Sequence, residues 1–245
     1  MDLKSLAISK MKALVLCAGK STRIESIGKG KPKPLIELGG QSILSRNLLW
    51  LSQSGITDIW MNLHYRPEEI ISHVGDGSQF GVSVKYIREP EILGTAGAVK
   101  NLSSEWSDTF LVVCGDNLFN FSLELFYQSH KNNKASATIA LFNREQHLHT
   151  GIAGGQVVLS GQLIQNFIEG NREKLSPYVN AGAYFLEPSV LNLIPAQMMY
   201  DFGKELFPKM VQNGEKIAGH IIDGYCLGID TPESYHNAIQ ILEKL

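Results

Sequence analysis

The sequence predicts an α/β protein with a doubly wound, mostly parallel sheet, because short apolar runs alternate with segments of helical periodicity as far as residue 141. The first apolar run, KALVLCAG at 12–19, ends in glycine as a buried strand does before a turn. The next segment, 43–55, places apolar residues at helical spacing and stops at Gly55. Ligands bind at the carboxyl ends of strands in such sheets, so the loops after residues 17, 88 and 114 are the places to look for a site.

The remaining elements continue this alternation. Further strands are expected at 57–65, 82–89, 108–116 and 134–142, with helices at 66–77, from 95 to 103 and at 122–133. After about residue 150 the rhythm loosens, with strands expected within 151–169 and 177–188, and helices near 189–213 and 231–244. We expect a single domain, 1–245, with a first half at about 12–145. The second half, about 146–245, is expected to supply a β-rich insertion and a closing C-terminal helix.

Composition excludes several classes of protein. The net charge of this 245-residue chain is −2, which gives no general attraction to nucleic acid or to an anionic membrane. No apolar segment reaches 18 residues, so neither a signal peptide nor a membrane span is expected. Cys17, Cys114 and Cys226 are far apart and lie in apolar runs, which favours buried thiols and a cytoplasmic location.

The stretch LCAGKSTRIESIGKGKPKPL, residues 16–35, follows the first strand and concentrates glycines and lysines. A glycine-rich turn there would expose backbone N–H groups that can hold an anion. The stretch has neither the GxxxxGK[ST] pattern nor the GxGxxG pattern. Taken alone, it is better explained as an ordinary strand-to-helix turn with solvated lysines.

The spacing of the whole stretch resembles the signature of the sugar-1-phosphate nucleotidylyltransferases, L-x-A-G-x-G-T-R-L-x-P-L-T-x-x-x-P-K-P-L. Three positions depart from it, at Ser21, Ser26 and Gly28. The positions that match are Leu16, Ala18, Gly19, Thr22, Arg23, Pro32, Lys33, Pro34 and Leu35. The resemblance implies a Rossmann-like nucleotidyltransferase fold in which the first half binds the nucleotide and the second half binds the sugar.

The resemblance implies two catalytic cations. Arg23 would grip the pyrophosphate through its fork of donors, and Lys33 would place a charge between the sugar phosphate and the α-phosphate. Pro32 and Pro34 would restrict the backbone around Lys33. The expected nucleotide contacts are Leu16, Ala18, Gly19, Lys20, Ser21, Thr22, Glu89, Gly94 and Thr95.

The segment EPEILGTAG, 89–97, resembles the part of the family that reads the base. A carboxylate only accepts hydrogen bonds, and guanine offers two donors on its pairing edge where uracil offers one. Glu89 therefore favours GTP slightly over UTP. An exposed glutamate at a strand end is the alternative interpretation.

Two aspartates are the expected Mg²⁺ ligands. Asp116 follows a buried strand in FLVVCGDN, where the alternative role is to cap that strand. GYCLGIDTPESYHNA, 224–238, resembles the family's G-Y-W-x-D-I-G-T-P-E-x-Y with its aspartate displaced by two positions to Asp230. Asp223 is a weaker substitute, and Thr231 also fits the cap of the last helix.

The sugar site is expected from NFIEG at 166–170 and VNAGAYF at 179–185, which resemble the family's E-K and N-x-G segments. The lysine expected after Glu169 is replaced by Gly170. Two alternatives follow: Arg172 or Lys174 replaces its contact with the phosphate, or the sugar is held differently. The expected sugar contacts are Asn117, Glu169, Asn180 and Gly182.

These observations favour transfer of a nucleotidyl group from an NTP to a sugar 1-phosphate, with Mg²⁺ and without a covalent intermediate. The chain most resembles short members acting on mannose, heptose or N-acetylmuramate phosphates, and the left-handed β-helix of longer members is not expected. The expected partners are the two substrates, a homo-oligomer is compatible with the sequence, and no nucleic acid or membrane is expected. The alternatives are a non-catalytic nucleotide-sugar-binding regulator of the same fold and, less favoured, an NAD-dependent enzyme.

Overall fold

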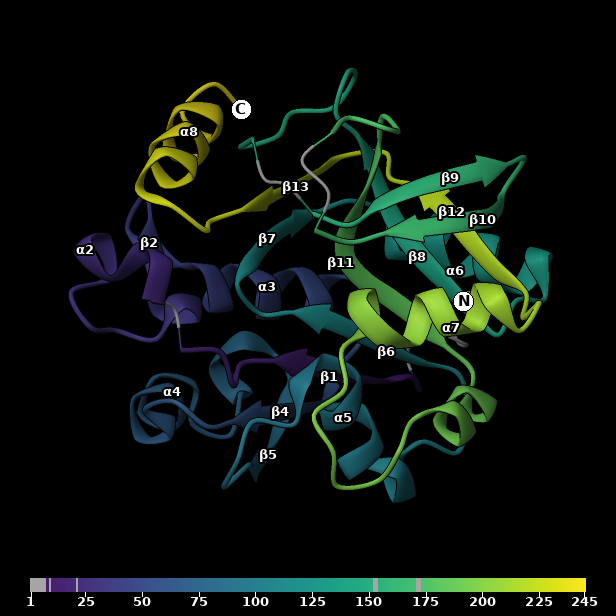
Figure 1. The fold of residues 1–245 in the computed structure, drawn as a ribbon. Helices are drawn as coiled ribbons and strands as arrows, with labels where there is room; N and C mark the ends of the chain where they lie inside the picture. The colour runs from purple at the N-terminus through teal and green to yellow at the C-terminus, as the bar shows by residue number, and fades with distance from the viewer. Residues whose placement is uncertain (1–7, 9, 21, 152–153, 171–172) are drawn as a thin grey trace.

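The first half of the chain forms four parallel strands. The structure, a computed structural model, describes residue 8 and residues 10–20, 22–151, 154–170 and 173–245. In the order β5–β4–β1–β6, neighbouring strands pair in parallel (Figure 1). The strands are β1 (Lys12–Leu16), β4 (Asp58–Leu63), β5 (Ser83–Arg88) and β6 (Phe110–Cys114).

Helices cover both faces of this sheet, as a doubly wound arrangement requires. Ala13 and Val15 of β1 belong to one apolar cluster and Leu14 to another, because successive side chains of a strand point to opposite faces. The first cluster includes residues of α3 (Ile43–Gln53), α4 (Pro67–Val74) and α6 (Leu123–Asn133), and the second includes residues of α5 (Gly94–Asn101) and α7 (Phe207–Gln212).

The second half extends the same sheet, which becomes mixed. Strand β11 (Tyr178–Leu186) pairs antiparallel with both β6 and β8 (Ala137–Asn143). The expected mostly parallel sheet therefore describes β5, β4, β1 and β6, whereas beyond them β11 lies antiparallel between β6 and β8, and β8 pairs in parallel with its other neighbour. The sheet continues through β12 (Ile217–Ile221), β10 (Leu163–Ile168) and β9 (Gln156–Ser160).

Two pairs of short strands stand outside the main sheet. β2 (Glu37–Leu38) pairs with β3 (Gln41–Ser42), and β7 (Asn117–Asn120) pairs antiparallel with β13 (Tyr225–Gly228). The closing helix is α8 (Pro232–Leu242), and no helix in the described part of the chain is long and apolar enough to cross a membrane. The other short helices are η1 (Thr22–Ile24), α2 (Glu25–Gly28), η2 (Lys33–Leu35), η3 (Ser78–Phe80), η4 (Ser103–Glu105), η5 (Pro188–Leu193) and the π-helix η6 (Phe202–Leu206).

Candidate active site

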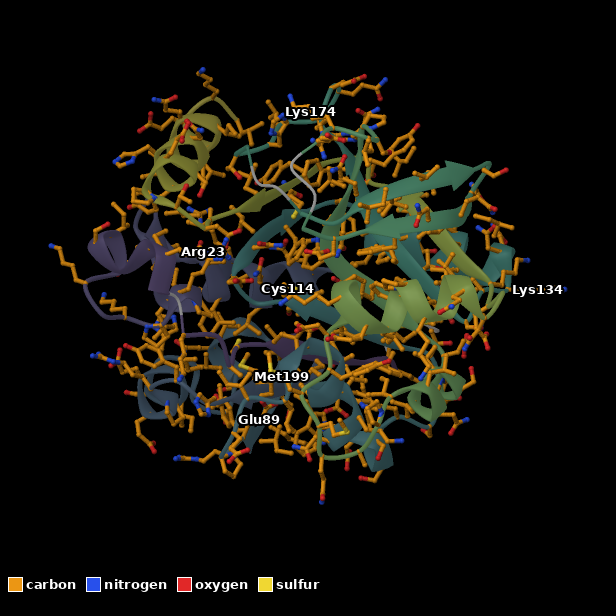
Figure 2. All side chains as sticks on the ribbon, in the orientation of Figure 1. Arg23, Glu89, Cys114, Lys134, Lys174 and Met199 are labelled. Atoms are coloured by element: carbon orange, nitrogen blue, oxygen red, sulfur yellow. The ribbon has the colours of Figure 1, made fainter. Side chains whose placement is uncertain are left out.

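A cavity of about 410 Å³ opens at the carboxyl ends of β1 and β6. The two strands are in register there, with Leu16 opposite Cys114. Figure 2 shows Arg23, Cys114 and Met199 around the centre of the molecule, where this cavity lies. Its wall comprises Leu16, Cys17, Ala18, Gly19, Lys20, Arg23, Ile24, Lys33, Pro34, Asn62, Ile92, Gly94, Thr95, Cys114, Asp116, Met199, Asp201 and Asp230.

Lys33 lies between two carboxylates at the base of this cavity. It stands at the start of η2 with buried prolines on both sides, and only 5% of the residue is exposed. Its Nζ donates to Asp116 Oδ2 at 2.7 Å and to Asp230 Oδ1 at 2.5 Å. Burial alone would lower the pKa of Lys33, but the two carboxylates outweigh burial and raise that pKa, so the side chain is an ammonium ion.

The pairing of β7 with β13 explains how Asp230 reaches this position. Asp116 directly precedes β7 and Asp230 follows β13, and Asn117 lies opposite Gly228 in the antiparallel register. The two aspartates therefore meet at one end of the strand pair, although the sequence separates them widely. Asp230 Oδ1 also accepts from Arg23 Nη2 at 3.3 Å.

Asp223, the weaker candidate, lies at the opposite end of the same strand pair. Its Oδ1 accepts from the backbone N–H of Ser122 at 2.8 Å, where α6 begins. The structure thus gives Asp223 a capping contact and leaves it outside the cavity wall.

The carboxylate oxygens around Lys33 are suitable ligands for a hard divalent cation. Within the described residues no three metal-ligating side chains gather, but two carboxylates together with phosphate oxygens are a normal environment for Mg²⁺. Asp116 and Asp230 would hold it. The thiols of Cys17 and Cys114 are not candidates, because burial, followed by the charge of Asp116, raises the pKa of both.

The loop after β1 lines the cavity as expected. Leu16, Ala18, Gly19 and Lys20 are all on its wall, and a side chain added at Gly19 would meet no atom within 4 Å. The backbone there is open to a ligand. Ser21 lies outside the described residues, and Thr22 begins η1. The Arg23 side chain is 74% exposed at the mouth.

Glu89 is placed differently from a residue that reads a base. It is 3% exposed and absent from the cavity wall. One of its oxygens accepts from Asn62 Nδ2 at 2.9 Å and the other from the backbone N–H of Leu93 at 3.1 Å. Asn62 Oδ1 in turn accepts from the N–H of Cys17 at 3.0 Å, so Glu89 supports two loops of the cavity through contacts within the protein.

The start of α5 is occupied by another segment of the chain. The N–H groups of Ala96 and Gly97 both donate to Tyr200 O at 2.9 Å. Thr95 Oγ1 donates to Asp201 Oδ1 at 3.1 Å and accepts from the N–H of Phe202 at 2.8 Å. Gly94 (φ +74°) and Thr95 line the cavity, but the contacts of Thr95 bind the two halves of the chain together.

Three of the four predicted sugar residues meet at the middle of β11. Gly182 (φ +81°) lies where the pairing of β11 with β8 shifts register. Its N–H donates to Asn180 Oδ1 at 2.9 Å, and Asn117 Nδ2 donates to Ala181 O at 3.1 Å. The structure therefore brings Asn117, Asn180 and Gly182 together, beside rather than on the main cavity wall.

Glu169 lies apart from that group, against two glycines. Its Oε2 is so close to Gly155 and Gly203 that a side chain at either would collide with it. Burial raises the pKa of Glu169, while the nearby Lys204 acts in the opposite sense. Arg172 is outside the described residues, and Figure 2 shows Lys174 at the edge of the molecule, away from Arg23 and Cys114.

Sequence reasoning missed several cavity residues, chiefly Asn62, Met199 and Asp201. Asn62 sits near the carboxyl end of β4, so the rule that such ends carry the ligand would have found it. Met199 and Asp201 come from a segment that is positioned by its hydrogen bonds to α5. No local sequence pattern predicts those long-range bonds.

Comparison with known proteins identifies the family. The chain is 34% identical to UTP–glucose-1-phosphate uridylyltransferase of Synechocystis sp., over 94% of this chain and 63% of that protein. It is 28% identical to mannose-1-phosphate guanylyltransferase of Mycobacterium tuberculosis, over 94% of this chain and 64% of that protein. The chain thus spans less than two thirds of the length of these curated relatives.

Solved structures share the fold. HddC from Yersinia pseudotuberculosis superposes with a TM-score of 0.77 at 21% identity, covering 95% of this chain and 99% of that one. The inositol-1-phosphate CTP transferase from T. maritima gives 0.74 at 18% identity, covering 97% and 98%. The nucleotidyl transferase family model matches residues 12–244, which confirms the resemblance seen in the sequence. Since that match covers almost all of the chain, the protein belongs to the nucleotidyl transferase family.

Proposed function

We propose that this chain catalyses transfer of a nucleotidyl group from an NTP to a sugar 1-phosphate, giving an NDP-sugar and pyrophosphate. The observation that carries the proposal is the convergence of Lys33, Asp116 and Asp230 at the carboxyl ends of β1 and β6. Sugar-phosphate activity in the curated relatives supports the choice of acceptor.

In the proposed reaction an oxygen of the sugar phosphate attacks the α-phosphorus, and the bond between that phosphorus and the oxygen leading to the β-phosphate breaks. Pyrophosphate leaves with the electron pair of that bond, and no covalent intermediate with the protein forms. Mg²⁺, when bound, neutralises phosphate charge. The residues of the chain supply positioning and electrostatic stabilisation, which carry most of the catalysis in phosphoryl-type transfer.

Arg23, Lys33 and the loop after β1 each have a proposed task. The open backbone around Gly19 accepts the phosphates, and Arg23, exposed at the mouth, binds the departing pyrophosphate. Lys33 stabilises negative charge that develops around the α-phosphorus. Its raised pKa keeps it charged throughout the physiological range.

The sugar is proposed to bind near β11 and η6. Asn117, Asn180 and Gly182 lie together there, joined by hydrogen bonds within the protein, and Glu169 lines a neighbouring hollow of about 460 Å³ together with Lys204. Lys204 also lines that hollow. It is proposed to contact the sugar phosphate in place of the lysine that Gly170 replaces.

The base is proposed to lie toward Ile92 and Met199, the apolar part of the cavity wall. Both oxygens of Glu89 accept hydrogen bonds within the protein, so neither is free to bind the base. Glu89 therefore gives no reason to prefer GTP over UTP. Both nucleotides therefore belong in the test.

Pyrophosphate release with Mg²⁺ tests the proposal, using four NTPs against glucose, mannose, heptose and amino-sugar 1-phosphates. We expect turnover with at least one pair and its loss in Lys33→Ala. Tight binding of an NTP without turnover for any pair would support the non-catalytic alternative and refute the proposal.

A further inference from the structure

The ammonium of Lys33 occupies the space that a bridging cation would need. It contacts one oxygen of Asp116 at 2.7 Å and one of Asp230 at 2.5 Å, and the residue is 5% exposed. A Mg²⁺ ion sits about 2.0–2.1 Å from its carboxylate oxygens. An ammonium and a divalent cation cannot both lie between these two oxygens.

We propose that Lys33 and the divalent cation compete for the carboxylates of Asp116 and Asp230, so that entry of the cation transfers the Lys33 ammonium to the phosphates of the bound nucleotide. This inference rests on the proposed function, since it names how the metal and the nucleotide reach the same site. The alternative leaves Lys33 in place and seats the cation on the other oxygens, Oδ1 of Asp116 and Oδ2 of Asp230.

Electrostatics and local structure both favour exchange. A buried ammonium beside a divalent cation is repelled with little screening by water. The backbone on both sides of Lys33 is fixed, because Pro32 and Pro34 are buried and Leu35 and Ile36 close the turn through their N–H groups. The flexible part is the four-carbon stem of the lysine, which faces the cavity.

Exchange makes binding of the metal and the nucleotide cooperative. In the free protein the cation must displace Lys33 from two charge-assisted hydrogen bonds. Nucleotide phosphates offer the ammonium strong charged acceptors in exchange, so each ligand tightens the binding of the other.

The first test measures Mn²⁺ binding to the full chain without nucleotide, from the electron paramagnetic resonance signal of free Mn²⁺. Lys33→Met should bind Mn²⁺ at least tenfold more tightly than the wild type. Arg23→Gln is the matched control, because Arg23 also carries one positive charge but, among the ion pairs of the described residues, contacts one of the two carboxylates, that of Asp230 at 3.3 Å, from an exposed position. It should tighten binding less than threefold. Equally tighter Mn²⁺ binding in both variants would show that only the net charge matters, and would overturn the proposal. Unchanged Mn²⁺ binding in Lys33→Met would also overturn it.

The second test uses the wild type and so does not depend on folding of the variant. A crystal structure with Mn²⁺, located by anomalous scattering, should show Lys33 Nζ more than 4 Å from both carboxylates. Retention of the two contacts beside a bound Mn²⁺ would overturn the exchange. If the chain turns over yet retains both contacts, only this inference fails. If exchange occurs without turnover for any substrate pair, only the proposed function fails.

Discussion

At the scale of single residues, Asp223 and Asp230 lie near opposite ends of β13 and serve different purposes. Asp230 touches Lys33 and Arg23, whereas Asp223 accepts from the N–H of Ser122. We expect Asp230→Asn to lower kcat/KM at least about 100-fold, because it removes one of two carboxylates around the reacting phosphates.

Asp223→Asn is the matched control for that variant. It keeps an oxygen that can cap α6, so it should change kcat/KM by less than about twofold and the free energy of unfolding by less than about 1 kcal/mol. The measurements are steady-state kinetics and urea unfolding. Equal losses of activity in the two variants would contradict the assignment of Asp230.

Glu89 is predicted to position the loops of the cavity rather than to read the base. Glu89→Gln puts an NH₂ group against donors from Asn62 and Leu93, so one buried hydrogen bond is lost at a cost of about 1–3 kcal/mol in unfolding free energy. We expect KM for the NTP to rise while the ratio of GTP to UTP activity stays constant. The exposed neighbour Glu91 supplies the control, Glu91→Gln, which should match the wild type. A changed GTP to UTP ratio in Glu89→Gln would show that Glu89 contacts the base.

The sequence predicts which residues line the cavity only where a motif fixes their spacing. Arg23, Lys33 and Asp116 lie on the cavity wall because strand ends and a proline-flanked turn place them there directly. The contacts of Glu89 could not be predicted, since Asn62 comes from another strand and only the register of β4 with β5 brings them together.

At the scale of elements, α5 and η6 cap each other across the two halves of the chain. Thr95 donates to Asp201 and accepts from the N–H of Phe202, and Tyr200 O accepts from two N–H groups of α5. We expect Thr95→Val to lower the free energy of unfolding by about 1–3 kcal/mol and to raise the KM of both substrates.

Thr109→Val is the control for Thr95→Val. Its hydroxyl also donates to a carboxylate, that of Glu187 at 2.8 Å, but it precedes β6 at the end remote from the cavity. Both variants should lose stability in urea unfolding, and only Thr95→Val should alter KM. Unchanged kinetics in Thr95→Val would contradict a role for the α5–η6 contact in shaping the cavity.

Lys204, in the hollow beside η6, is predicted to affect binding of the sugar 1-phosphate. Lys204→Met should raise KM for the sugar 1-phosphate about tenfold, because a cation facing its phosphate is lost, and should leave KM for the NTP unchanged. Lys209, exposed on α7, provides the control Lys209→Met. A rise in KM for the NTP alone would show that Lys204 contacts the NTP, and would contradict its assignment to the sugar phosphate.

At the scale of the whole molecule, periodicity predicted most elements but not the order of the strands. The strands expected at 134–142 and 177–188 exist as β8 and β11. Their neighbours depend on long-range pairing, since β11 enters between β6 and β8 and makes the sheet mixed. A local pattern carries no information on which strand lies beside which.

His130, which is buried, and His220, which is half-buried, predict how stability depends on pH. Burial lowers the pKa of His130 and of His220, against weaker opposing effects of Glu187 and Asp223. Both histidines therefore stay neutral in the folded protein at pH values where the unfolded chain takes up protons, below about 6.5. The free energy of unfolding should fall as the pH falls from 8 to 5.5. His220→Phe, which keeps the stacking on Phe126, should flatten this dependence in urea unfolding. An identical slope in the variant would contradict the assignment.

Lys33, Asp116 and Asp230 are proposed to form the centre of a nucleotidyl transfer site. The most direct measurement is Mg²⁺-dependent release of pyrophosphate from an NTP in the presence of a sugar 1-phosphate, with formation of the NDP-sugar followed by mass spectrometry. We expect one NDP-sugar for each pyrophosphate in the wild type and neither product in Lys33→Ala. Nucleotide binding without either product, across the whole panel of substrates, would contradict this proposal.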